Sequence, residues 1–207
     1  MLVNNPEGWV QDRVRNLVNN LCASYAATYV ERTEDVPEGD AAFFIGCSRI
    51  VPPAILARNR LNLVVHGSDL PQGRGFSPIP WQVAGGSNRI PIVLFRAEEA
   101  LDAGPIYLRD VLELDGTELL PEIHRKTWER IESLILRFLQ SPRIEPTPQS
   151  GTPSFYPRRG RKDDEIDPQR SIAEQFDRLR VVDNERYPAW FLHRGQRYLL
   201  RISKDEG

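Results

Sequence analysis

The chain has 207 residues, a formal net charge of −2 and two cysteines. This length suffices for one well-packed domain with an appendage, and the nearly balanced charge does not indicate an extended surface for nucleic acid. Cys22 and Cys47 do not belong to any ligand cluster, so no metal site is expected. No apolar run approaches the roughly 20 residues of a membrane helix, and the N-terminus has no secretory pattern. We therefore expect a cytoplasmic protein in a reducing compartment, without a membrane partner.

The first 115 residues alternate between strand-like and helix-like patterns. A helix is predicted to open at Pro6, because apolar residues then recur with the period of an α-helix as far as Leu21. The chain starts with the short apolar run 1–3. Apolar runs predict strands at 26–30, 41–45, 61–65, 91–96 and 105–112, and short helices are predicted at 52–57 and 80–84. Such alternation is typical of an α/β fold with a Rossmann-like, mostly parallel sheet flanked by helices.

The second half begins with a long amphipathic helix predicted at 119–139. Five prolines between 141 and 157 then indicate a connector that crosses the surface. A helix near 168–180 and a β-hairpin with Gly195 in its turn follow. We expect a Rossmann-like domain at 1–140, then the connector and a small C-terminal appendage of helix and hairpin at 141–207.

Two polar residues stand at predicted strand ends. His66 follows an apolar strand and opens a loop rich in Gly, Ser and Pro, and Asp102 heads the turn Asp-Ala-Gly-Pro. Ligands of α/β sheets bind beyond the carboxyl ends of the strands, which places the loops at 47–52, 66–75 and 97–104 on one edge. His66 and Asp102 are then candidates for an acid–base pair. Each taken alone is also compatible with an ordinary loop residue.

The block around these residues resembles the signature of the folate-dependent formyltransferases, and above all the sugar N-formyltransferases. The residues that carry the resemblance are His66, Ser68, Leu70, Pro71, Arg74, Gly75, Asp102 and Gly104. The tail segments 155–159 and 182–188 resemble the tail of the sugar enzymes. The resemblance implies formyl transfer from N10-formyltetrahydrofolate to the amine of a nucleotide-linked amino sugar, in surface polysaccharide or pseudaminic-type sugar biosynthesis. It also implies a catalytic domain at 1–140, a small-molecule partner, no nucleic-acid partner and a possible homodimer.

The resemblance also implies roles for individual residues. His66 stabilises the developing oxyanion, and Asp102 orients His66 and helps to relay the amine proton. The second oxyanion donor is either Ser68 or a backbone N–H of the 66–69 loop. The residues expected to bind the folate are Arg49, Ile50, Val51, Glu99, Leu101 and Asp102. Those expected to bind the sugar nucleotide are Arg74, Tyr156, Arg158, Arg159, Asn184 and Tyr187; the arginines suit a diphosphate.

One position departs from the family pattern. The family has a catalytic Asn two residues before its His, and this chain has Val64 there. Asn62 lies on the same face of the strand but about 7 Å further back, so the role does not pass to it. Two alternatives therefore stay open: a formyltransferase acting on another small amine, and a divergent folate-binding protein with little activity.

Overall fold

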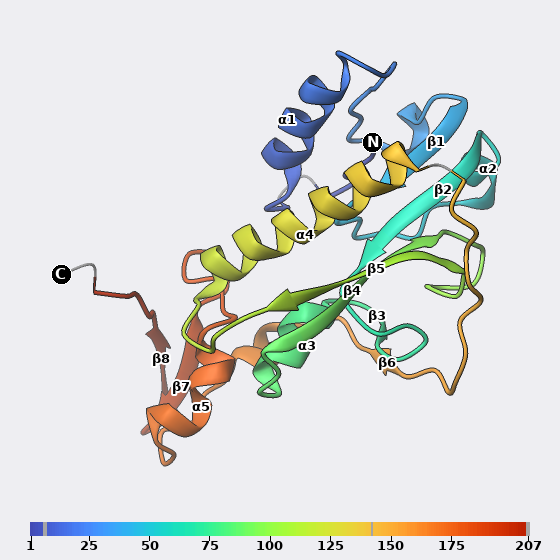
Figure 1. Ribbon diagram of the computed structural model, residues 1–207. Coiled ribbons are helices and arrows are strands. Elements are labelled where there is room, and N and C mark those ends of the chain that lie inside the picture. The colour runs from blue at the N-terminus through green and yellow to red at the C-terminus, as the bar shows by residue number, and fades with distance from the viewer. Residues whose placement is uncertain (6–7, 142, 206–207) are drawn as a thin grey trace.

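The computed structural model describes residues 1–5, 8–141 and 143–205. Its centre is a four-stranded sheet in the order β1-β2-β4-β5, with α4 lying across one face (Figure 1). The strands are β1 (Gly39–Phe44), β2 (Asn59–His66), β4 (Arg89–Arg96) and β5 (Ile106–Glu113). β1 and β2 pair in parallel, and β4 is antiparallel to both of its neighbours. Three of the four strands therefore run in one direction, which confirms the predicted α/β class, and β4 alone is reversed.

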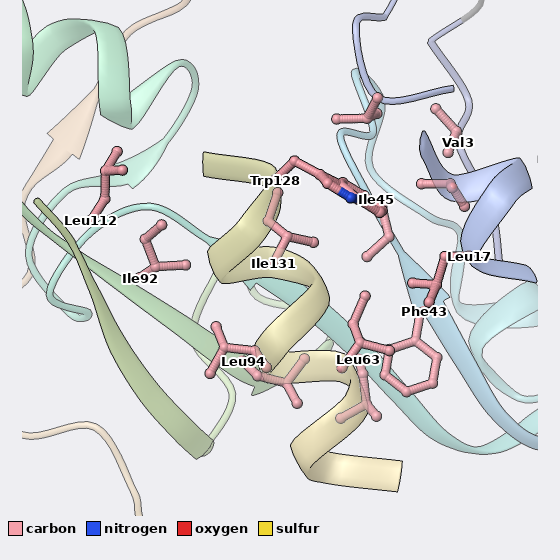
Figure 2. Packing of buried hydrophobic residues seen from close by; sticks show 14 of the residues in the cluster. Val3, Leu17, Phe43, Ile45, Leu63, Ile92, Leu94, Leu112, Trp128 and Ile131 are labelled. Carbon is pink, nitrogen blue, oxygen red and sulfur yellow. The ribbon is translucent and has the colours of Figure 1, made fainter. Parts of the chain in front are cut away.

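One face of the sheet is covered by α1 (Gln11–Leu21) and α4 (Leu120–Gln140). Figure 2 shows Trp128 and Ile131 of α4 above Ile92 and Leu94 of β4, with which they share the main core cluster. The apolar period of α4 buries one stripe of the helix against the sheet. The Glu122 carboxylate accepts a hydrogen bond from the Leu119 backbone N–H at 3.0 Å and so caps the start of α4.

The rim of the sheet carries shorter elements. These are α2 (Pro53–Leu56), α3 (Pro78–Ala84), two 3₁₀ turns (Thr33–Asp35 and Arg161–Asp164), and a small parallel sheet of β3 (Arg74–Gly75) with β6 (Phe155–Tyr156). The β3–β6 pairing fixes the connector to the loop after β2. The predicted boundary at residue 140 stays a prediction, and the chain on its two sides is in close contact.

The C-terminal part contains α5 (Ile172–Leu179) and the hairpin of β7 (Ala189–His193) and β8 (Gln196–Leu200). The Ser171 hydroxyl accepts a hydrogen bond from the Glu174 N–H, so α5 begins after Ser171 and not at 168. Gly195 has a φ of 78°, as the turn of the hairpin requires. Helix and hairpin confirm the predicted appendage.

Two predicted elements need comment. The strand predicted at 26–30 is wrong, because only Val30 bridges to Leu2 and most of the segment is at least partly exposed. The predicted helix start at Pro6 lies outside the described residues, and α1 begins at Gln11. In the described part of the chain, no helix combines the length and the apolar character needed to cross a bilayer.

Candidate active site

A cavity of about 420 Å³ opens where β1 and β2 end. Its walls come from the 47–52 loop, the 66–75 loop, the 97–104 loop, the segment before α1 and the helices α3 and α4. Its lining includes Trp9, Ser48, Arg49, Ile50, Val51, Val64, His66, Phe76, Glu98, Leu101, Asp102, His124 and Arg158. All three loops predicted to share a functional edge therefore reach one cavity.

The 97–104 loop reaches the cavity by a different route from the one expected. Because β4 is reversed, this loop starts beside the middle of β2, where the Ala97 N–H donates to the Asn62 carbonyl at 2.7 Å. The prediction that all three loops follow the carboxyl ends of parallel strands is wrong for this one. The loop then turns back along β2, and that turn brings Asp102 to His66.

His66 is the last residue of β2 and is 7% exposed. Its Nε2 lies 2.8 Å from the Gly73 carbonyl, which can only accept, so Nε2 carries the proton and donates. The ring meets Phe95 edge to face, with 6.4 Å between centroids. These contacts leave Nδ1 facing Asp102, with 3.8 Å between Nδ1 and Oδ2.

Asp102 is held as firmly as His66. Its Oδ2 accepts a hydrogen bond from the Gly75 N–H at 2.8 Å, and its side chain is 12% exposed. The backbone of Asp102 is left-handed, with a φ of 49°. Gly104 completes the turn at a place where a Cβ would lie 1.9 Å from the Arg96 carbonyl oxygen. A preorganised imidazole and carboxylate at a cavity wall can stabilise a developing negative charge and move a proton.

The expected folate residues mostly gather on one side of the cavity. Arg49, Ile50, Val51 and Leu101 line it together with Asp102, whereas Glu98 and not Glu99 contributes the acidic side chain. Phe44, Leu56 and Val64, which belong to one apolar cluster with Val51, also line the cavity, as does Phe95. An apolar slot between two polar loops suits a flat heterocycle with polar edges.

Ser68 and Arg74 lie close in sequence to His66 but outside the cavity wall. The Ser68 hydroxyl is 2% exposed and donates to the Gln72 carbonyl at 2.8 Å, so it is not directed at the cavity. The Arg74 guanidinium donates to Gln149 at 2.7 Å. We therefore assign neither residue a contact with substrate.

Among the tail residues, only Arg158 lines the cavity. Its guanidinium donates to the Ser48 carbonyl at 2.8 Å and lies over the Phe76 ring, 4.2 Å from its centroid. Tyr156 instead stacks beside Trp81, with 6.5 Å between centroids. Arg158 is thus the tail residue placed to meet a bound anion.

The remaining predicted tail residues have structural partners or lie elsewhere. Arg159 pairs with Asp164 at 2.5 Å, and both side chains are 11% exposed. The Asn184 amide exchanges two hydrogen bonds with the backbone of Ile202. Tyr187 is exposed and outside the cavity wall, beside Arg186. The structure does not bring these three residues to His66.

The sequence reasoning missed the opposite wall of the cavity. Trp9 and His124 stack there with 4.2 Å between ring centroids and 5° between planes. Burial lowers the pKa of His124 to about 4, so this imidazole is neutral at pH 7. His124 sits on the apolar stripe of the long helix, and a periodic pattern does not distinguish a packing residue there from a wall residue. Gln149 was also missed, because nothing in its Pro-rich surroundings singles it out.

Comparisons with known proteins identify the family and the fold. The sequence model described as formyl transferase matches residues 28–139, just over half of the chain, and includes both His66 and Asp102. A methionyl-tRNA formyltransferase of Thermosipho melanesiensis is 29% identical over 145 residues, 70% of this chain and 47% of that protein. The chain thus spans about half the length of the curated relatives it matches.

Solved structures share the fold at low sequence identity. A methionyl-tRNA formyltransferase from Clostridium thermocellum matches all of this chain and 93% of its own, with a TM-score of 0.83 at 21% identity. A sugar N-formyltransferase from a Shewanella species matches 99% and 96%, with a TM-score of 0.74 at 12% identity. HypX from Aquifex aeolicus, solved with tetrahydrofolic acid, matches 97% and 37%, with a TM-score of 0.77 at 15% identity. On the match to the sequence model, the chain belongs to the formyl transferase family.

Proposed function

We propose that the protein is an N-formyltransferase that moves the formyl group of N10-formyltetrahydrofolate to the amine of a nucleotide-linked amino sugar. The observation that carries the proposal is the pairing of His66 with Asp102, 3.8 Å apart, at the wall of a cavity that has an apolar slot on one side. Membership of the formyl transferase family is consistent with this chemistry.

His66 and Asp102 have different roles in the proposed reaction. The neutral amine attacks the formyl carbon, and a C–N bond forms as the carbonyl oxygen becomes an oxyanion. Because Nε2 of His66 already donates to the Gly73 carbonyl, the donor to that oxygen is Nδ1, which carries a second proton and lies 3.8 Å from Asp102, too far for a hydrogen bond to it. This interaction is stronger in the transition state than with the bound substrates. Asp102 receives the proton of the attacking amine through water. The bond to the folate nitrogen then breaks, that nitrogen takes up a proton, and the products are a formamide and tetrahydrofolate.

The slot around Val51 and Leu101 is the proposed donor site. Its apolar floor fits a pterin ring, and the two loops that border it present polar edges. HypX shares this fold and binds tetrahydrofolic acid. Val51 and Leu101 would hold the donor in this slot, and His66 would act on its formyl group.

The acceptor is proposed from the tail and from the charge of the chain. Arg158 stands at the cavity mouth, where its guanidinium suits a phosphate oxygen. A net charge of −2 does not favour a tRNA. The methionyl-tRNA formyltransferases among the relatives favour the opposite reading. The acceptor experiment must therefore include tRNA.

Mass spectrometry with a panel of acceptors tests the proposal. The purified protein is incubated with N10-formyltetrahydrofolate and UDP-, dTDP-, GDP- or CMP-linked amino sugars, or with methionyl-tRNA. A mass gain of one formyl group on one sugar nucleotide is the expected result. Formylation of methionyl-tRNA alone would overturn the sugar assignment, and formylation of another small amine would replace it.

Val64 favours a second candidate, a folate-binding protein with little activity. This valine lines the cavity where the family pattern has an amide. The amide of Asn62 cannot substitute, because its Nδ2 donates to the Leu56 carbonyl at 2.8 Å and it lies outside the wall. Tetrahydrofolate binding by calorimetry, with no product from any acceptor, would select this candidate.

A further inference from the structure

The connector between α4 and α5 contacts Asp102 directly and the loop that holds the His66 ring. It leaves the end of α4, runs along the molecule and joins β3 through β6 (Figure 1). We propose that residues 147–156 form a positioning clasp that sets His66 and Asp102 against each other, with Gln149 as its central residue. This inference rests on the proposed function of the pair.

On the His66 side, the clasp holds the loop whose carbonyl accepts the hydrogen bond from the imidazole. The Gly73 carbonyl receives the hydrogen bond from Nε2 of His66, while the Gly73 N–H donates to the Ser154 hydroxyl at 2.9 Å. The adjoining backbone is paired as well, since the Arg74 N–H donates to the Ser154 carbonyl at 2.9 Å. The position of the imidazole partner therefore depends on the connector.

The connector and the loop after β2 approach each other too closely to leave room for side chains on the two glycines of that loop. A Cβ on Gly73 would lie 2.7 Å from the Tyr156 ring, and one on Gly75 would lie 2.4 Å from the Tyr156 carbonyl oxygen. Both glycines also have positive φ, 70° and 101°. Gly75 is the residue whose N–H donates to the Asp102 carboxylate. The clasp thus sits directly behind the donor that orients Asp102.

On the Asp102 side, Gln149 binds the turn itself. Its Nε2 donates to the carbonyls of Asp102 and Gly104, both at 2.8 Å. Its Oε1 accepts from the Arg74 guanidinium at 2.7 Å, which fixes the orientation of the amide. One amide therefore links the left-handed Asp102 turn to the strand that follows the His66 loop.

The clasp lies outside residues 28–139, which match the family model. Gln149 does not line the cavity, so its effect on the reaction passes through Asp102 and it is a positioning residue. A misplacement of about 1 Å between reacting groups can reduce a rate about 100-fold. Loss of the Gln149 contacts should therefore reduce kcat while leaving the donor slot intact.

The test uses the full chain with Gln149→Leu and Gln149→Glu. Leucine keeps much of the volume and removes every hydrogen bond. Glutamate keeps the acceptor for Arg74 but places an oxygen against the two carbonyls. Ser150→Ala, at the exposed next residue, is the matched control. Circular dichroism and thermal unfolding establish that each variant is folded at the assay temperature.

Two readouts separate positioning from bulk stability. The first is the ¹⁵N spectrum of the His66 ring in substrate-free protein, which is readily assigned among three histidines. The second is steady-state kinetics with the acceptor that the mass-spectrometry panel identifies. We expect changed His66 ring shifts, kcat lower by about 10- to 100-fold, and KM for the folate within about 3-fold of wild type in both Gln149 variants.

Wild-type ring shifts together with wild-type kcat in both Gln149 variants would overturn the clasp. So would an equal change in Ser150→Ala. If the wild-type protein transfers no formyl group, the proposed function fails and the ring spectra still decide whether Gln149 positions the pair.

Discussion

At the scale of single residues, the proposed mechanism depends most directly on the negative charge of the Asp102 carboxylate. Asp102→Asn retains an oxygen for the Gly75 N–H but loses the carboxylate that faces His66 and receives the amine proton. We predict a fall in kcat of about 10²- to 10⁴-fold with little change in KM. Asp69→Asn is the matched control, since Asp69 is exposed and pairs with Arg109 away from the cavity. An unchanged kcat in Asp102→Asn would remove Asp102 from the mechanism.

His124 provides a residue-scale prediction on pH. Its folded-state pKa of about 4 lies below the 6.5 of an unperturbed imidazole, because burial disfavours the charged form. The unfolded state therefore binds a proton first on acidification. The contribution of neutral His124 to stability is fully present above about pH 6.5 and is lost as the pH falls towards 4.

His124→Phe tests this linkage while keeping a ring against Trp9. The free energy of unfolding of wild type, relative to that of the variant, should fall by about 2 kcal/mol between pH 7 and pH 5. Urea unfolding at several pH values measures it. A difference that does not depend on pH would show that the folded protein accommodates the imidazolium.

At the scale of elements, α5 is attached to the core by a buried charge network. Arg180, just after α5, is fully buried and faces Glu118 at 3.7 Å and Asp177 at 2.7 Å. Lys126 of α4 pairs with the same Glu118. Burial opposes the ionisation of Glu118, but the Lys126 ammonium and the backbone N–H donors of 115–118 outweigh it and lower its pKa. The network joins α5, α4 and the turn that precedes α4.

Arg180→Met should destabilise the protein by about 3 kcal/mol, because it leaves the buried Glu118 carboxylate short of a partner. Arg178→Met should lower the stability much less, because the exposed Arg178 side chain donates to the Glu165 carbonyl on the surface. Chemical denaturation of both variants measures the difference. Equal stabilities would mean that α5 is held by its apolar contacts alone.

The elements also show how far the sequence could predict this fold. Periodicity located α4 and the strands around His66, because these segments bury a regular apolar stripe. It predicted a strand at 26–30 from apolar residues of which none is fully buried. It could not find the two-residue strands β3 and β6, whose pairing depends on tight glycine packing between distant segments. His66 and Asp102 could be predicted because they lie in short sequence motifs. The placement of Arg159, Asn184 and Gln149 could not, because it depends on tertiary contacts.

At the scale of the whole molecule, binding of the donor should stabilise the fold. Tetrahydrofolate at 100 times its dissociation constant should add about 2.7 kcal/mol to the free energy of unfolding. Ile50→Asp places a charge on an exposed residue of the donor wall, so it should weaken this stabilisation without lowering the ligand-free stability. Thermal unfolding with and without tetrahydrofolate measures both. No stabilisation of the wild type would count against the donor slot.

The central claim is that this fold transfers a formyl group to an amine and that His66 stabilises the transition state. The most direct test follows a ¹³C-labelled formyl group from N10-formyltetrahydrofolate to the acceptor, for wild type and His66→Gln side by side. The account predicts label on the acceptor amine with wild type, and a rate at least about 100-fold lower with His66→Gln despite retained tetrahydrofolate binding. Equal transfer by both proteins, or no transfer by the wild type to any amine, would contradict it.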